Sequence, residues 1–290
     1  MYKWLIAADS SCDLDKNTFD CGDIAFETVP LTIRVGEREF VDLPGTDPND
    51  MFAAMKAHKG PTSSACPPPE MFAEQFRKAQ FSFCVTITSN LSGTYNCAVQ
   101  AKEMVLEESP EKKIHIIDSL STGGTMVLII NKLRELIEQG LEFEEIVEKI
   151  DAYRDSTVIL FSLATFDTLI KNGRMNPVVG LMASALNIHP VAYNPGGVIV
   201  VMEKPRGEKK AINRIATLMT EKFKFKVGTP IVITHCNNPN AVKTAADAIK
   251  QMYGISDSDI TYTECTCLTS YYAGDQSILV SFEGEGSIHK

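Results

Sequence analysis

The sequence predicts an α/β protein of two domains. The N-terminal domain is expected to hold a mainly parallel sheet flanked by helices, and the C-terminal domain a mixed or antiparallel sheet with helices. The length of 290 residues, 44% of them apolar and 22% charged, suits two globular cores. Short apolar runs alternate with amphipathic segments, as in strand–helix–strand units. In the second half, a turn at residues 194–197 indicates a hairpin instead of a crossover helix. We place the domains at residues 1–156 and 157–290.

The N-terminal domain is predicted to contain three strands and three helices. The strands are apolar runs at residues 4–8, 83–88 and 114–118, and the helices are amphipathic segments at 95–108, 124–139 and 143–154. Ser92 is well placed as the N-cap of the first helix. Each strand ends in small polar residues. Because ligands of open α/β sheets bind beyond the carboxyl ends of the strands, these polar ends predict one wall of a pocket.

The C-terminal domain is predicted to contain strands around its hairpin and helices that cover them. The strands are expected at residues 157–165, 190–193, 198–203, 231–235, 260–267 and 278–282, and the helices at 166–171, 177–187, 210–223 and 241–252. The strand at 260–267 would place Cys265 and Cys267 on one face. No second pair at zinc spacing accompanies these two cysteines, so a core role is favoured.

Composition excludes several classes of function. A net charge of −9 and a pI near 5.2 disfavour nucleic acid and anionic membrane surfaces as partners. The apolar stretch at residues 4–8 is too short for a signal peptide, and no run approaches the ~20 apolar residues that span a bilayer. We therefore expect a cytoplasmic protein without membrane insertion, with its eight cysteines reduced. The five histidines are isolated, so neither a metal nor another cofactor is expected.

A hydroxyl-rich junction at residues 89–94 is the first candidate site. Ser89 and Ser92 supply hydroxyls, Gly93 admits close backbone approach, and the following helix presents free N–H groups at its positive end. An anion would be stabilised there. The alternative, in which Ser92 is only a helix cap, is equally well supported by these residues alone.

Two further segments offer groups that bind a carboxylate. Thr62 and Ser63 belong to a hydroxyl run that precedes a rigid proline segment, and Arg174 follows Gly173 at the expected end of a helix. Neutral hydroxyls beside a helix N-terminus suit a carboxylate whose remaining part is apolar. The alternatives are an exposed loop for the hydroxyl run and a solvated side chain for Arg174.

Nucleotide binding and serine hydrolysis have little support. No Gly-x-Gly-x-x-Gly or Walker sequence follows a strand. A Ser92–His235 pair would be the basis of a serine acyl hydrolase, but the sequence around Ser92 lacks the leading glycine of the nucleophile elbow.

Six short motifs together resemble those of the DegV family. They are DSSCDL at 9–14, TSS at 62–64, SNLSGTY at 89–95, DS at 118–119, LIKNGR at 169–174 and RGEKKA at 206–211. The motifs follow the family order and span nearly the whole chain. The resemblance implies a long-chain fatty acid in a tunnel between the two domains, with its carboxylate held by hydroxyls at Thr62 or Ser63 and at Ser92. It also implies that Arg174 belongs to the polar network near the ligand head.

The resemblance further implies that some members present the bound acid to a separate ATP-binding kinase subunit and are not themselves enzymes. This chain departs from the family in two respects. Tyr272 stands where the family carries a histidine, and Ala65-Cys66 stands where many members carry a Ser-Gln pair. A phenol can donate a hydrogen bond to a carboxylate but does not become a cation near neutral pH. We therefore expect the chain to bind a fatty acid but to support phosphorylation of that acid poorly.

The function predicted from the sequence is thus non-catalytic binding of a long-chain fatty acid, for presentation to a fatty acid kinase. The expected ligand-binding residues are Thr62, Ser63, Ser89, Ser92, Gly93, Arg174 and Tyr272. Two alternatives stay open. One is a serine acyl hydrolase that uses Ser92, and the other is a carrier of a different anionic amphiphile without coupling to a kinase.

Overall fold

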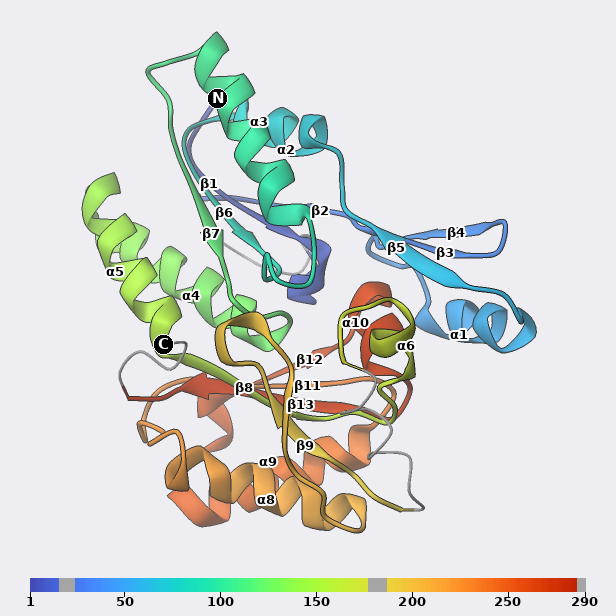
Figure 1. The fold of residues 1–290 in the computed structure, drawn as a ribbon. Helices are drawn as coiled ribbons and strands as arrows, with labels where there is room; N and C mark the ends of the chain where they lie inside the picture. Colours follow the sequence, from blue (N-terminus) through green and yellow to red (C-terminus); the bar gives the residue numbers. More distant parts are fainter. Residues whose placement is uncertain (16–23, 177–186, 286–290) are drawn as a thin grey trace.

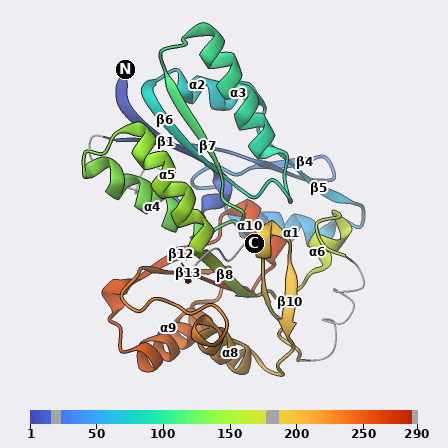
Figure 2. The same ribbon diagram turned by 60° about the vertical axis from the view of Figure 1, so that its left-hand side comes forward.

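Two sheets lie one above the other, with helices around and between them (Figure 1). The computed structural model describes residues 1–15, 24–176 and 187–285. The upper sheet of Figure 1 is built from the N-terminal half of the chain and the lower sheet from the C-terminal half. The view in Figure 2 shows the same two layers after a turn of 60°. The predicted α/β class, with a parallel sheet followed by a mixed one, is confirmed.

The upper sheet has four parallel strands in the order β2-β1-β6-β7. These are β1 (Tyr2–Asp9), β2 (Ala25–Val29), β6 (Ala79–Thr86) and β7 (Lys113–Asp118). Side chains alternate between its faces. Leu5 and Ala7 pack against α2 (Pro69–Phe76) and α3 (Thr94–Glu108). Ile6 and Ala8 pack against α4 (Gly124–Glu138) and α5 (Phe143–Ser156). Helices therefore cover both faces, as expected of a parallel sheet.

The lower sheet has six strands in the order β10-β9-β8-β13-β11-β12, and only β11 and β12 run parallel. Its strands are β8 (Thr157–Ser162), β9 (Val191–Tyr193), β10 (Val200–Glu203), β11 (Ile231–His235), β12 (Ile260–Glu264) and β13 (Ile278–Glu283). Helices α8 (Glu208–Glu221) and α9 (Pro239–Tyr253) cover one face through contacts with Val158 and Leu160. Ile159 and Phe161 point to the other face, toward the upper half of the molecule.

Helix α4 joins the two halves. It contacts β1 and β6 of the upper sheet and β8, β11 and β13 of the lower sheet, and its first seven residues are all buried. Its start approaches the lower sheet closely, because a Cβ on Gly124 would lie 2.9 Å from Ser281 Oγ and 2.9 Å from Val232 Cγ1. Glycine is therefore required at this position. The chain passes from one sheet to the other at α5 and β8, yet the division into domains at residue 156 remains a prediction.

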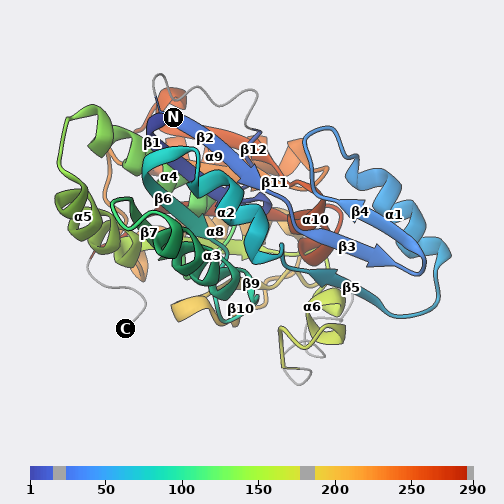
Figure 3. The same cartoon turned by 90° about the horizontal axis from the view of Figure 1, so that it is seen from above.

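A third, smaller sheet was not predicted. It contains β3 (Thr32–Val35), β4 (Arg38–Val41) and β5 (Thr62–Ala65), all antiparallel, in the order β4-β3-β5. Viewed from above, this sheet projects to one side together with α1 (Pro48–Ala57) (Figure 3). Helix α10 (Cys267–Ala273) contacts both α1 and β3, so a C-terminal helix fills the space beneath this sheet. The short helix α6 (Asp167–Lys171) lies beside α10.

Several predicted boundaries are corrected by the structure. The strand expected at 260–267 ends at Glu264, and Cys267 begins α10, so Cys265 and Cys267 do not share a strand face. Helix α3 begins at Thr94 after Gly93, so Ser92 is not its N-cap residue. The strand expected at 157–165 ends at Ser162. The helix expected at 177–187 lies, except for its last residue, outside the described residues.

Within the described ranges, no helix is both long enough and apolar enough to cross a membrane.

Candidate functional site

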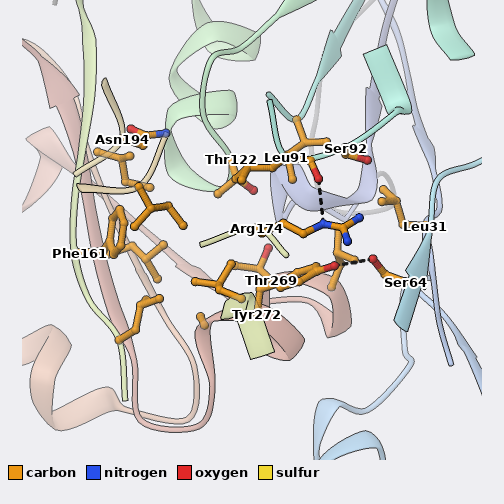
Figure 4. Close-up of a pocket in the computed structure, with 18 residues that line it drawn as sticks. Leu31, Ser64, Leu91, Ser92, Thr122, Phe161, Arg174, Asn194, Thr269 and Tyr272 are labelled. Carbon is orange, nitrogen blue, oxygen red and sulfur yellow. Dashed lines mark hydrogen bonds between the residues drawn. The ribbon is translucent and has the colours of Figure 1, made fainter. Parts of the chain in front are cut away.

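A pocket lies between the upper and lower sheets, beyond the carboxyl ends of β6 and β7 (Figure 4). It encloses about 770 Å³ of empty space, including its opening to solvent. Its apolar lining consists of Leu31, Ile87, Leu91, Ile159, Phe161, Leu163, Leu169, Ile199, Leu268, Ala273 and Leu279. Its polar lining consists of Ser64, Ser92, Thr122, Arg174, Asn194, Thr269 and Tyr272.

Four of the seven polar side chains gather toward one end of the pocket, whereas Asn194 lies near Phe161 and Thr122 and Thr269 lie between. In Figure 4, Ser64, Ser92, Arg174 and the hydroxyl of Tyr272 lie on one side, whereas Phe161 lies on the other among aliphatic side chains. Ser64 Oγ and Tyr272 Oη share a hydrogen bond of 2.7 Å. The pocket is therefore amphipathic, with a polar end and a long apolar remainder.

Strand β5 directs alternate residues of the hydroxyl run toward helix α10. Ser64 faces Tyr272, and Thr62 Oγ1 shares a hydrogen bond of 2.7 Å with the hydroxyl of Tyr271. Ser63 is exposed on the opposite side of the strand. Because side chains alternate along a strand, Thr62 and Ser64 share one face and Ser63 points away from the pocket. Ser64 was not selected from the sequence, although the period-two rule would have paired it with Thr62.

The junction before α3 contributes Ser92 to the pocket. Its hydroxyl shares a hydrogen bond of 2.8 Å with Thr94 Oγ1 and accepts one of 3.3 Å from the Thr94 backbone N–H. Gly93 and Ser89 are exposed and do not line the pocket. The backbone N–H of Ser89 instead donates to Asp118 at 3.1 Å. Of the residues selected at this junction, the structure brings only Ser92 to the polar end.

A glycine turn places Arg174 over the polar end. Gly173 has a φ of +72°, a left-handed conformation that suits glycine, and it reverses the chain after α6. Arg174 Nε donates to the carbonyl of Leu91 at 3.2 Å, and Nη1 donates to that of Asn172 at 2.5 Å. Across the described ranges, no carboxylate forms an ion pair with Arg174. Donors of its guanidinium therefore remain for an anion.

Tyr272 is a neutral donor in this site. Burial raises the pKa of its phenol, and this effect exceeds the lowering by the Ser64 hydrogen bond and by the charge of Arg174. At neutral pH the phenol is therefore protonated. One cation and several neutral hydroxyls form an environment that suits a single carboxylate.

Two buried carboxyl groups, Asp13 and Asp42, support the start of α10, and a third, Asp9, binds the backbone of Ser11 and Ile87. Asp13 Oδ1 accepts hydrogen bonds from Thr266 N at 2.9 Å and from Thr266 Oγ1 at 3.0 Å. Asp42 accepts from the same hydroxyl at 3.1 Å. Burial raises the pKa of Asp13 to about 8, and those of Asp9 and Asp42 to about 6. From the sequence, Asp9 and Asp13 were noted as part of the DSSCDL motif, and the cluster with Asp42 was missed, because it becomes visible only when α10 is in place.

Asp13 also faces the pocket lining. The buried hydroxyl of Thr269, which lines the pocket, interacts with the Asp13 carboxyl group and counters part of the rise in its pKa. The region described by the structure contains no group of three or more side chains that could hold a metal ion.

Among the described residues, no histidine forms a hydrogen bond with Ser92. Within the described part of the chain, the hydrogen bonds of Ser92 Oγ go to Thr94 alone. His235 lies on β11, where its Nδ1 accepts from Asn238 N at 3.1 Å. The arrangement does not bring a histidine to the serine.

Comparisons with known proteins agree on one family. The sequence model described as "Uncharacterised protein, DegV family" matches residues 3–284. A DegV domain-containing protein of Streptococcus pyogenes is 39% identical over 282 residues, which cover 97% of this chain and 99% of the relative.

Solved structures agree with this match. The Fatty Acid Kinase (Fak) B3 protein of Streptococcus pneumoniae, loaded with linoleic acid, is 37% identical with a TM-score of 0.92, covering 98% of this chain and 100% of that one. A DegV family protein of Eubacterium eligens, loaded with heptadecanoic acid, is 35% identical with a TM-score of 0.91, covering 97% of this chain and 100% of the other.

Proposed function

Because the chain belongs to the DegV family, we propose that it binds one long-chain fatty acid in the pocket between its two sheets. One observation carries the proposal: the pocket is apolar along most of its length, and its polar end has one arginine among hydroxyl groups. Two similar solved structures hold linoleic and heptadecanoic acid, which have this same division into head and tail.

The tail supplies most of the affinity and the polar end sets the orientation. Burial of each methylene contributes roughly 0.8 kcal/mol, so a long chain contributes more than any single hydrogen bond. We assign the carboxylate to Ser92, Arg174 and Tyr272, with Ser64 as the pocket-lining hydroxyl of the TSS run. Thr62 supports this end through Tyr271, whereas Ser63, Ser89 and Gly93 lie farther out.

Presentation of the carboxylate to a separate ATP-binding kinase subunit is the second part of the proposal. One similar structure is a Fatty Acid Kinase B3 protein. This chain has no Walker or Gly-x-Gly-x-x-Gly sequence of its own, which favours a non-catalytic role. A serine acyl hydrolase is disfavoured by the hydrogen bonds of Ser92, which go to Thr94 among the described residues.

Arg174→Met tests the nature of the ligand head. We expect the Kd for a long-chain acid to rise about tenfold to a hundredfold, because a hydrogen bond to a charged group contributes about 1.5–3 kcal/mol. The Kd for the corresponding fatty alcohol should change little. Competition titration with the acid and the alcohol measures both values.

Arg174→Lys is the matched control that separates the positive charge of Arg174 from the geometry of its guanidinium group. It keeps the cation and loses the planar fork, so its preference for acid over alcohol should lie between those of the parent and Arg174→Met. An unchanged preference in Arg174→Met would contradict binding of a carboxylate at this end. Equal affinity of the parent for both ligands would instead favour a different amphiphile.

Tyr272→His tests coupling to a kinase. The family resemblance places a histidine at this position, and a phenol near neutral pH cannot carry the positive charge or release a proton as an imidazole can. We expect ATP-dependent acyl-phosphate formation with a kinase subunit to rise on the order of a hundredfold, the lower range for a positioned acid or base. The Kd for the acid should change far less.

Tyr272→Phe and the melting temperature separate chemistry from packing. The phenylalanine variant removes the hydrogen bond to Ser64 and keeps the ring, so it should not gain rate. If Tyr272 only fills space, Tyr272→His lowers the melting temperature, Tyr272→Phe leaves it nearly unchanged, and neither variant gains rate. If the acid bound to the parent is phosphorylated rapidly and Tyr272→His does not change this rate, position 272 does not limit phosphoryl transfer.

A further inference from the structure

Two partly exposed cysteines lie sulfur to sulfur beside the polar end of the pocket. Cys66 directly follows β5, Cys97 lies in the first turn of α3, and their Sγ atoms are 3.7 Å apart. Both side chains are partly exposed. The remaining described cysteines are all buried: Cys12, Cys84, Cys236, Cys265 and Cys267. Among the described cysteines, this pair is therefore the one that a reagent in solution can reach.

The pair connects the two segments that bring hydroxyl groups to the pocket. Cys66 lies two residues after Ser64, and Gly93 lies next to Ser92 in the sequence. A Cβ added to Gly93 would be 3.6 Å from Cys66 Sγ, so the end of β5 touches the start of α3. Ser64 and Ser92 both line the polar end (Figure 4). A covalent bond between the sulfurs would fix the distance between these two segments.

We propose that Cys66 and Cys97 form a reversible disulfide that ties β5 to α3 and slows entry and release of the pocket ligand. The disulfide itself is independent of the ligand's identity. Its effect on exchange rests on the proposed fatty-acid function.

The oxidant for this step is a low-molecular-weight disulfide. Cys66 thiolate attacks one sulfur of R–S–S–R and displaces R–S⁻, which leaves a mixed disulfide on Cys66. Cys97 then loses its proton to solvent, attacks Cys66 Sγ and displaces the second R–S⁻. Two protein thiols are oxidised by two electrons, and one small disulfide is reduced to two thiols.

The two cysteines have different roles in this sequence. The pKa of Cys97 is raised to about 11, mainly by burial and to a lesser degree by the neighbouring Cys66. Cys97 therefore holds its proton at neutral pH. The first attack therefore comes from Cys66, and Cys97 resolves the mixed disulfide. The sulfurs must approach from 3.7 Å to the bonded distance of about 2.05 Å, which side-chain rotation and a small shift of the edge strand β5 can provide.

Peptide mapping tests the disulfide. The native protein is incubated with oxidised glutathione at neutral pH, alkylated, digested without reduction and analysed by mass spectrometry. We expect a peptide pair linked through Cys66 and Cys97 that disappears on reduction with dithiothreitol. Cys97→Ser should instead retain glutathione on Cys66. A parent protein that carries glutathione on Cys66 without the linked pair, or that stays fully reduced, would overturn the proposal.

Release kinetics test the effect on the pocket. The fluorescent acid cis-parinaric acid is loaded, and its release to lipid vesicles is followed for the oxidised and reduced parent and for Cys66→Ser. Oxidation should slow release from the parent about tenfold, equivalent to roughly 1.4 kcal/mol in the barrier, and should not change Cys66→Ser. Equal rates in both states of a parent shown to be linked would refute control of exchange. If cis-parinaric acid does not bind at all, the fatty-acid proposal fails, while the peptide map still decides on the disulfide.

Discussion

Thr122→Trp should abolish binding of long-chain acids. Thr122 lines the pocket between the polar end and Phe161, and it lies in the loop after β7, where a large side chain need not disturb a sheet (Figure 4). An indole at this position would occupy the space that the tail must cross. Loss of about six methylenes from the pocket, at roughly 0.8 kcal/mol each, raises the Kd more than a thousandfold. Equilibrium titration with a long-chain acid measures this change.

Thr122→Val is the matched control for this blockade. Valine has nearly the shape of threonine and removes only the weak 3.4 Å hydrogen bond to the carbonyl of Ser11. It should bind acids like the parent. Circular dichroism and the melting temperature must show that Thr122→Trp is folded. A folded tryptophan variant with parental affinity would place the tail somewhere other than this pocket.

Asp13→Asn should make the protein more stable above pH 7 and flatten the dependence of its stability on pH. The pKa of Asp13 is raised by burial from 3.8 to about 8. A raised carboxyl pKa means that the folded state holds a proton that the unfolded state has lost. The contribution of this proton to the free energy of unfolding is complete below the pKa of the unfolded state. It is lost as the pH rises toward 8, by up to about 1.4 kcal/mol per pH unit.

Asparagine reproduces the neutral form of this side chain. Its Oδ1 can still accept the two hydrogen bonds from Thr266, and folding no longer requires the uptake of a proton at this side chain. Urea unfolding of both proteins between pH 5 and pH 8 should therefore give free energies that diverge as the pH rises. Asp247→Asn, at an exposed position on α9, should run parallel to the parent. A parallel curve for Asp13→Asn as well would mean that Asp13 is already ionised in the folded protein.

Most strands of the two large sheets were predictable because they are largely apolar, but β2 was not predicted. Strands buried on both faces, such as β1 and β6, need apolar residues at every position, and this pattern is visible without tertiary information. The predicted strand at 231–235 coincides with β11. The mixed character of the second sheet followed from the hairpin turn between β9 and β10.

The third sheet was not predictable from patterning. Its strands have four residues each and mix charged and hydroxyl side chains, as in β5 with its sequence Thr-Ser-Ser-Ala. They are stabilised by pairing with one another and by packing on α10, which lies more than 200 residues later in the chain. Cys267 was placed in a strand for the same reason, since the burial of α10 depends on β3 and α1.

The chemical character of the site was predictable from the sequence, but the residues that form it were less so. Ser92 follows the end of β6, Arg174 follows the glycine turn after α6, and Tyr272 lies on α10, which none of the six motifs covers. The register of β5 determines which residue of the hydroxyl run faces the pocket, because Ser64 points inward and Ser63 points outward. No local pattern distinguishes these two serines until the pairing of β5 with β3 is known.

Native mass spectrometry of the purified protein tests the central claim most directly. Protein expressed in bacteria and kept free of detergent is measured before and after extraction with organic solvent, and the extract is analysed for acids. The account predicts a folded protein heavier by the mass of one long-chain fatty acid, with that acid recovered in the extract and its binding restored on addition. Identical masses before and after extraction, together with no saturable uptake of any long-chain acid, would contradict it.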